Sequence, residues 1–238
     1  VEGLPMMNDD FHVYDTTLRD GAQREGISYS VNDKLAVARL LDEFGVGFIE
    51  GGWPGALPKD TEFFARAREE LSLVNAQLVA FGATRKAGVA VADDPQVQAL
   101  LDSQAPVVTL VAKSDVRHVA EALRTTPEEN LAMVRDTVAH LVGHGRRVFI
   151  DCEHFFDGYR NDPDYGVRLL IDAFEAGASV GVLCDTRGGT AEFRARGGVV
   201  LSTGDFAANA EMRAVFFLRR TSVSGWATCP RGLGGCVL

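Results

Sequence analysis

The chain has 238 residues, of which 46% are hydrophobic and 24% are charged, so it is long and apolar enough to bury one sizeable core. Its formal net charge of -9 argues against a surface that binds nucleic acid or an anionic membrane. No apolar run approaches the roughly 20 residues that cross a bilayer, and residues 1–10 lack the basic and apolar regions of a secretory signal. We therefore expect a globular, cytoplasmic protein.

Short apolar runs recur along the chain, and several are rich in β-branched residues. Each run is apolar over most of its length, which is typical of a parallel strand that is covered on both faces. We predict six strands, over residues 11–17, 46–52, 78–84, 107–113, 147–154 and 179–186.

Helical patterns lie between the predicted strands. Ser30 is a suitable N-cap for a helix over residues 31–44, and Gly45 follows as its end signal. Another amphipathic pattern predicts a helix over residues 164–175. Because strand and helix alternate six times, the predicted class is α/β with a parallel sheet.

The segment "TPEE" is the strongest helix start in the chain. Thr126 is the expected N-cap, Pro127 suits the first helical position, and Glu129 completes a predicted capping box. An apolar stripe follows at helical spacing and is expected to be buried: Leu131, Val134, Val138 and Leu141.

Polar residues follow the predicted strands at one end. In a (β/α)₈ barrel the active site is built from the C-terminal ends of several strands, whereas a doubly wound sheet binds its ligand at one switch point. No glycine-rich nucleotide fingerprint opens any of the helices, so we predict a TIM-type barrel. The polar residues at strand ends are Arg19, Asp20, Glu50, Thr84, Arg85, Lys113, Ser114, Glu153, His154, Asp185 and Thr186.

Seven sequence blocks occur in an order that is far more specific than any one of them. Together they resemble the citramalate synthase branch of the 2-isopropylmalate/homocitrate synthase family, within the HMG-CoA lyase-like, DRE-TIM metallolyase group. The resemblance covers about residues 11–189. The blocks are "DTTLRDGAQ" (15–23), "SVNDK" (30–34), "FIEGGWPG" (48–55), "PKD" (58–60), "EALRTTPEEN" (121–130), "EHFFDGY" (153–159) and "LCDTRGG" (183–189).

The resemblance implies a reaction and its participants. It implies a Claisen-type condensation of acetyl-CoA with a 2-oxo acid, pyruvate in the case of citramalate, in branched-chain amino-acid biosynthesis. It also implies a barrel that holds Mg²⁺ or Mn²⁺, and a homodimer. Such hard cations prefer carboxylate and carbonyl oxygens, and they chelate an oxo acid through its keto and carboxylate oxygens.

The same resemblance assigns roles to five residues of this chain. Asp20 matches the carboxylate that binds the metal. Arg19 matches a catalytic and substrate-binding cation, which stabilises the alkoxide as it forms. Glu50 matches the acid that orients this arginine, Glu153 a carboxylate in the oxo-acid pocket, and Thr186 a hydroxyl that binds the substrate carboxylate.

Simpler roles remain open for several of these residues. Glu50 also fits an ordinary ion-pair partner at a strand end, and Thr186 also fits a helix N-cap. His154 is expected to pack at the barrel rim. The histidines 140 and 144 have the spacing of a metal pair, but we interpret them as an exposed helix end because no third ligand lies in the same block.

The resemblance stops after the sixth predicted strand. Family members supply further metal ligands from a His-x-His pair, and no two histidines of this chain are separated by a single residue. We therefore expect an N-terminal extension over 1–10, a partial catalytic barrel over 11–189, and a tail over 190–238 that is divergent or translated out of frame. A metal would then be weakly bound if at all. The alternatives to an active synthase are a non-catalytic remnant of such an enzyme and a carbon–carbon lyase or aldolase of the same superfamily.

Overall fold

The structure, a computed structural model, describes residues 12–179, 183–186 and 189–192. All of them belong to one compact unit that extends from Val1 to Val200. The expected N-terminal extension lies outside the described residues, as does all of the expected tail except residues 190–192.

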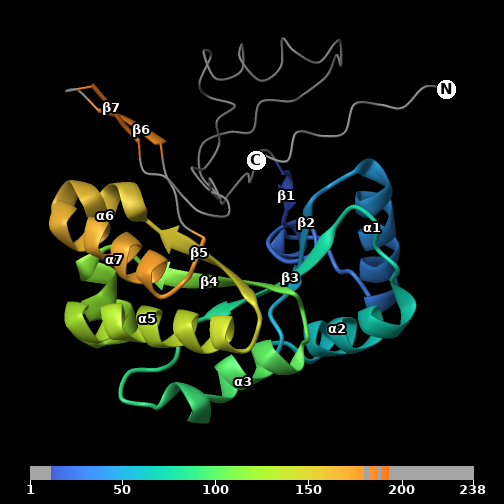
Figure 1. Cartoon of the computed structure of the whole chain (residues 1–238). Coiled ribbons are helices and arrows are strands. Elements are labelled where there is room, and N and C mark those ends of the chain that lie inside the picture. Colours follow the sequence, from blue (N-terminus) through green and yellow to red (C-terminus); the bar gives the residue numbers. More distant parts are fainter. Residues whose placement is uncertain (1–11, 180–182, 187–188, 193–238) are drawn as a thin grey trace. The chain divides into compact units, whose positions relative to one another are not determined.

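The described part of the chain contains a curled parallel sheet in which each strand pairs with the next one along the sequence (Figure 1). Parallel neighbours need a crossover connection, and helices provide it here. The strands are β1 (Tyr14–Asp15), β2 (Phe48–Gly52), β3 (Gln77–Ala83), β4 (Val107–Lys113) and β5 (Arg147–Glu153). This is the predicted α/β barrel fold, and among the described residues it is incomplete.

Helices cover the outer face of the sheet (Figure 1). The main ones are α1 (Val31–Phe44), α2 (Pro58–Glu70), α3 (Pro95–Asp102), α5 (Pro127–Gly143) and α7 (Pro163–Glu175). Shorter helical segments are η1 (Gly21–Gln23), η2 (Val91–Asp93), α4 (Val116–His118), η3 (Val119–Leu123) and α6 (Phe155–Asn161). A continuous apolar core lies between these helices and the sheet.

The predicted boundaries of α1 are confirmed. The Ser30 hydroxyl accepts a hydrogen bond from the Asp33 N–H, and the Asp33 carboxylate accepts one from the Ser30 N–H at 2.8 Å. Gly45 ends the helix with a φ of 87°, a conformation that costs glycine little. Local capping therefore determines both ends of this helix.

Helix α5 begins as predicted, but its capping box is incomplete. The Thr126 hydroxyl accepts from the Glu129 N–H at 3.2 Å. The Glu129 carboxylate does not return to the cap, because it accepts from Arg85 Nη1 at 2.7 Å and from the Gly88 N–H at 3.1 Å. A charged partner from another element outcompetes the local backbone N–H. The predicted apolar stripe of α5 is buried.

The sixth predicted parallel strand, over residues 179–186, is found only in part, and its residues 180–182 lie outside the described residues. Ser179 forms a single parallel bridge to Phe149 of β5. Beyond it, β6 (Leu183–Thr186) pairs antiparallel with β7 (Gly189–Glu192) in a separate two-stranded sheet. Only two residues, one of them Gly188, separate these strands in the sequence, and this pattern is a hairpin signal that competes with parallel pairing. The described parallel sheet therefore ends after the fifth strand.

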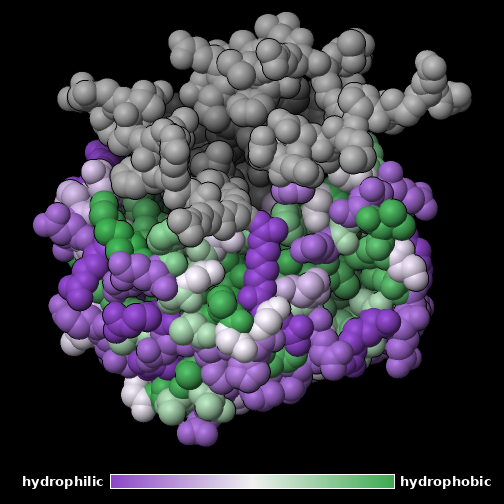
Figure 2. Space-filling view, viewed as in Figure 1, coloured by the Kyte–Doolittle hydropathy of each residue, from purple (hydrophilic) through white to green (hydrophobic). Residues whose placement is uncertain are grey.

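Apolar side chains are exposed on the outermost helices of this sheet. Helix α1 exposes Leu40 and Phe44, and α7 exposes Ile171 and Phe174. Figure 2 shows hydrophobic surface over α1 and near α6. None of the helices in the described residues is long and apolar enough to cross a membrane.

Candidate active site

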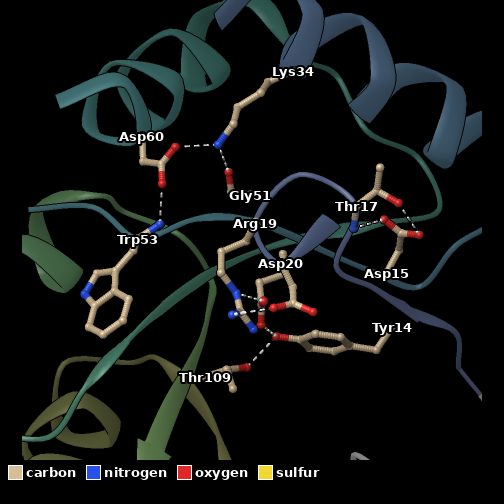
Figure 3. Close-up of polar contacts among 11 residues, drawn as sticks. Tyr14, Asp15, Thr17, Arg19, Asp20, Lys34, Gly51, Trp53, Asp60 and Thr109 are labelled. Atoms are coloured by element: carbon tan, nitrogen blue, oxygen red, sulfur yellow. Dashed lines mark hydrogen bonds and ion pairs between the residues drawn. The ribbon is translucent and has the colours of Figure 1, made fainter. Parts of the chain in front are cut away.

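The candidate site begins in the loop after β1, where a compact turn holds the Arg19–Asp20 pair. The Asp15 carboxylate accepts from the Thr17 N–H at 2.9 Å, and the carbonyl oxygen of Thr16 accepts from the N–H groups of Arg19 at 3.1 Å and Gly21 at 3.0 Å. These bonds turn the chain back over the C-terminal ends of the strands. The side chain of Arg19 consequently points into the inner face of the sheet (Figure 3).

Arg19 makes three contacts, two of them with the sheet and one with the neighbouring Asp20. Its Nε donates to Glu50 Oε1 at 2.5 Å, and its guanidinium carbon lies 3.8 Å from the centroid of the Phe81 ring. Its Nη1 lies 3.4 Å from Asp20 Oδ1. Within the described residues Nη2 makes no hydrogen bond, so the guanidinium keeps donors for an anionic ligand.

Glu50 is the buried member of this group. Its residue is 1% exposed in the middle of β2, and burial raises the pKa of its carboxyl group above the usual value although Arg19 and Tyr14 act in the opposite direction. The structure thus places Glu50 where the predicted orienting role requires it. Whether that role is catalytic stays a prediction.

Glu50 has a further partner, Tyr14, which in turn contacts Thr109, and the sequence predicted neither residue for the site. The Tyr14 hydroxyl, from β1, donates to Glu50 Oε2, and it lies 2.6 Å from the Thr109 hydroxyl of β4 (Figure 3). Both residues appear in the sequence only as members of apolar strands. Their alternation within a strand is the one signal that would have placed them on the inner face.

Glu153 lies at the end of β5, opposite Lys113 of β4 in the register. The two side chains form an ion pair that is partly exposed. This pair belongs to the same C-terminal edge as Arg19, because all five strands are parallel. Glu153 therefore stays a candidate for contact with a ligand at the barrel mouth.

Of the other residues considered in the sequence, Thr186 is in β6, paired with Gly189 of β7. His154 is exposed and in the left-handed conformation, with a φ of 58°, and its ring packs edge-on against His118 at 4.7 Å. The histidines 140 and 144 lie at the end of α5 with ring centroids 4.4 Å apart.

A buried ion pair fixes the loop that follows β2. Lys34 of α1 binds the carboxylate of Asp60 in α2 and also donates to the Gly51 carbonyl oxygen at 2.9 Å. The other oxygen of Asp60 accepts from the Trp53 N–H at 2.8 Å (Figure 3). Burial lowers the pKa of Lys34, and Asp60 opposes this effect. Lys34 and Asp60 both lie in blocks that carry the family resemblance, but no local pattern predicted that they would pair.

The described residues do not supply a complete metal site. Among them, no group of three or more His, Cys, Asp or Glu side chains is placed to hold an ion. Asp20 is the predicted ligand, and its nearest charged neighbour is the cation Arg19. This donor set does not fit a divalent ion by itself, because such ions take about six oxygen ligands.

A curled parallel sheet with outer helices and an arginine–carboxylate cluster at its C-terminal edge defines a barrel protein of the TIM class. The chain belongs to the HMGL-like family, whose model matches residues 10–199. The family match therefore extends one residue before and ten residues after the segment 11–189, over which the sequence blocks occur.

Two curated relatives align with about three quarters of this chain. It is 69% identical over 183 residues to a protein of Streptomyces coelicolor named (R)-citramalate synthase, an alignment that covers 77% of this chain and 34% of that protein. It is 55% identical over 178 residues to the (R)-citramalate synthase of Synechocystis, covering 75% of this chain and 32% of that protein. The chain thus spans about a third of the length of the curated relatives that it matches.

A solved structure of the same fold is the HMG-CoA lyase of Bacillus subtilis. It superposes with a TM-score of 0.57 at 14% sequence identity, covering 72% of this chain and 57% of the lyase. At this identity the likeness shows the fold alone.

Proposed function

We propose that this chain carries part of the catalytic barrel of a citramalate synthase-type acyltransferase. The reaction is the condensation of acetyl-CoA with a 2-oxo acid, pyruvate first among them, in isoleucine and leucine biosynthesis. The observation that carries the proposal is Arg19, held by Glu50 at the C-terminal edge of the sheet. The 69% identity to a protein named (R)-citramalate synthase supports the choice of reaction.

The chemistry explains why a fixed guanidinium is useful there. The methyl carbon of acetyl-CoA loses a proton and bonds to the keto carbon, and the electron pair of that carbonyl moves to its oxygen. The resulting alkoxide needs donors that are already in place. Arg19 stays protonated at all relevant pH values. Glu50 accepts from its Nε and Asp20 from its Nη1, so in this proposal Nη2 is the group that donates to the alkoxide. Protonation of the alkoxide and cleavage of the thioester by water then release CoA.

The remaining assignments are parts of the same proposal. Glu153 faces the oxo acid, Thr186 binds its carboxylate, and Asp20 is a ligand of a divalent ion that is weakly held if it binds at all. Because the described residues do not fit a metal by themselves, no step above passes through one. The partners are small molecules and a second copy of the chain, and the location is the cytoplasm.

Thiol release from acetyl-CoA tests the function directly. We expect release that depends on pyruvate, is slower with 2-oxoisovalerate or 2-oxoglutarate, and disappears in Arg19→Lys. Lysine keeps the charge but lacks the planar fork that both Glu50 and an oxyanion need. No release with any of the three oxo acids, with Mg²⁺ or Mn²⁺ present, would contradict a synthase.

A non-catalytic remnant of such an enzyme is the second candidate; within the described residues the parallel sheet has five strands. Calorimetric titration with Mn²⁺ and with pyruvate separates the two functions. Absence of both binding and turnover in a folded chain supports the remnant. The fold likeness to lyases gives the third candidate, carbon–carbon cleavage, no independent support.

A further inference from the structure

The ion pair of Arg19 and Glu50 is continued by two hydroxyl groups, those of Tyr14 and Thr109. The Tyr14 hydroxyl bonds to Glu50 Oε2, and the Thr109 hydroxyl lies 2.6 Å from the Tyr14 oxygen. Thr109 and Tyr14 are 2% and 5% exposed, so water has little access to these bonds. Three strands, β1, β2 and β4, each contribute one member of this hydrogen-bonded chain.

The direction of each bond follows from the groups involved. A Glu50 carboxylate that is ionised beside Arg19 has only acceptor sites, so the Tyr14 hydroxyl donates to it. The Tyr14 oxygen is then free to accept, and the Thr109 hydroxyl is the donor. Burial raises the pKa of Tyr14 well above its usual value, and the neighbouring Glu50 raises it further. The phenol therefore keeps its proton.

Each carboxylate oxygen of Glu50 therefore accepts a hydrogen bond from a different residue. Oε1 accepts from Arg19 Nε and Oε2 accepts from Tyr14, so rotation of the carboxylate about its own axis would break both bonds. Bonds in such a chain polarise one another and strengthen the arrangement. The position of the guanidinium thus depends on a hydroxyl that does not touch it.

We propose that Tyr14, supported by Thr109, is a positioning residue of the candidate active site, acting through Glu50 to hold the guanidinium of Arg19 in place for an oxyanion. Its effect on catalysis rests on the proposed synthase function. Its effect on the placement of Arg19 does not.

The competing explanation is that Tyr14 only fills space. Its ring packs against Phe48 and Phe149, with centroids 6.2 and 6.1 Å away. Tyr14→Phe keeps these contacts and removes a single oxygen atom, so it separates the two explanations. Thr109→Val removes the outer donor and is a second variant if the first fails to fold.

The matched control is Tyr165→Phe. Tyr165 is 6% exposed, close to the 5% of Tyr14, and its hydroxyl contacts Asn130 and a backbone carbonyl instead of Glu50. Tyr165→Phe therefore measures the effect of deleting a buried phenol oxygen that does not contact Glu50.

The first measurement is the NMR signal of the Arg19 Nε–H group, assigned by its loss in Arg19→Lys. We expect its exchange with water to be at least tenfold faster in Tyr14→Phe, faster to a smaller extent in Thr109→Val, and unchanged in Tyr165→Phe. This measurement needs no turnover, so it decides the placement even if the chain is inactive.

The second measurement is CoA release. Tyr14→Phe should lower kcat by about 10-fold to 100-fold, the range expected when reacting groups shift by about 1 Å, with little change in the KM for acetyl-CoA. An unchanged Arg19 signal in both Tyr14→Phe and Thr109→Val overturns the proposal. A changed signal in a chain that releases no CoA supports the placement and counts against the synthase function alone.

Discussion

Glu50 is a carboxylate held in a place where a charge is costly. Burial disfavours its ionised form, and only directed donors make ionisation acceptable. Arg19 and Tyr14 are those donors, and Phe81 covers the guanidinium from one side. Removal of Arg19 or Tyr14 therefore leaves the buried Glu50 carboxylate with one donor fewer.

Arg19→Met should destabilise the fold in a pH-dependent way. The pKa of Glu50 is already raised by burial, and loss of Arg19 raises it further because Arg19 acts to lower it. A carboxyl group whose pKa is raised in the folded state costs stability as the pH rises from its usual value through the raised one. We expect Arg19→Met to lose about 1–3 kcal/mol near pH 7 and less at pH 5. Urea unfolding at both pH values measures this loss.

Glu50→Gln in the Arg19→Met background is the control. Glutamine has no charge to bury, so the double variant should recover stability at pH 7 and lose its pH dependence in this range. Equal destabilisation of Arg19→Met at both pH values would show that Glu50 is not an ionised partner of Arg19.

The loop between β2 and α2 depends on one buried ion pair. Lys34→Met would leave Asp60 without its cation in a place that is 3% exposed. Breaking a buried pair from one side costs about 3–5 kcal/mol. The double variant with Asp60→Asn should cost less, since the asparagine oxygen still accepts from the Trp53 N–H. Thermal unfolding of the single and double variants tests the coupling.

Arg66→Ala is the matched comparison on α2. Its partner Glu70 lies one turn away, with Arg66 Nε and Glu70 Oε1 2.6 Å apart on an exposed face. Exposed pairs of this kind contribute little. If Lys34→Met proved as mild as Arg66→Ala, the buried pair would not be what holds this loop.

Helix α6 approaches the loop after β4 so closely that only glycine fits. A Cβ atom on Gly158 would overlap the carbonyl oxygen of Ser114 and lie 2.8 Å from its carbonyl carbon. Both are backbone atoms that cannot move without shifting the loop. Gly158→Ala should therefore cost about 1–3 kcal/mol through overpacking.

Gly143→Ala provides the contrast at the end of α5. A Cβ atom there meets nothing within 4 Å, and alanine favours the helix. We expect unchanged or slightly raised stability by urea unfolding. Equal effects of the two substitutions would show that α6 does not depend on this close approach.

At the scale of the molecule, the parallel sheet of the described residues has β1 and β5 as its edge strands. β1 has only two residues, and β5 has a single bridge on its outer side. On the α1 side, Leu40 is 62% exposed and Phe44 81% exposed, one turn apart on the same helix face. Open strand edges beside apolar surface favour association.

We therefore expect the isolated chain to associate with rising concentration. Sedimentation velocity across a range of concentrations should show this, and Leu40→Lys combined with Phe44→Glu should reduce it. Arg66→Ala, on the exposed face of α2, should leave association unchanged. A monomer at all concentrations, with one cooperative unfolding transition at high temperature, would indicate that the chain completes its own barrel.

Local chemistry was enough to predict helices α1, α5 and α7 and the type of sheet. Ser30 and Gly45 bound α1 because capping satisfies backbone groups within a few residues, and the stripe that begins at Leu131 faces the core because its spacing matches the helical period. The alternation of strand and helix likewise predicted parallel pairing. The resemblance added Arg19, Asp20 and Glu50, and the structure brings the first and last together.

Long-range contacts decided the rest. The bond between Tyr14 and Thr109 spans 95 positions, and that between Lys34 and Asp60 spans 26, so no local pattern specifies either partner. The Glu129 carboxylate does not form the predicted capping bond, because it accepts from Arg85, which belongs to a different part of the chain. The sixth predicted strand begins with the parallel bridge of Ser179 to Phe149, residues 180–182 lie outside the described residues, and residues 183–186 pair antiparallel with β7 instead. In each case the outcome depends on which groups the folded chain brings within reach, and buried charges select those partners most strongly because they cost the most when unpaired.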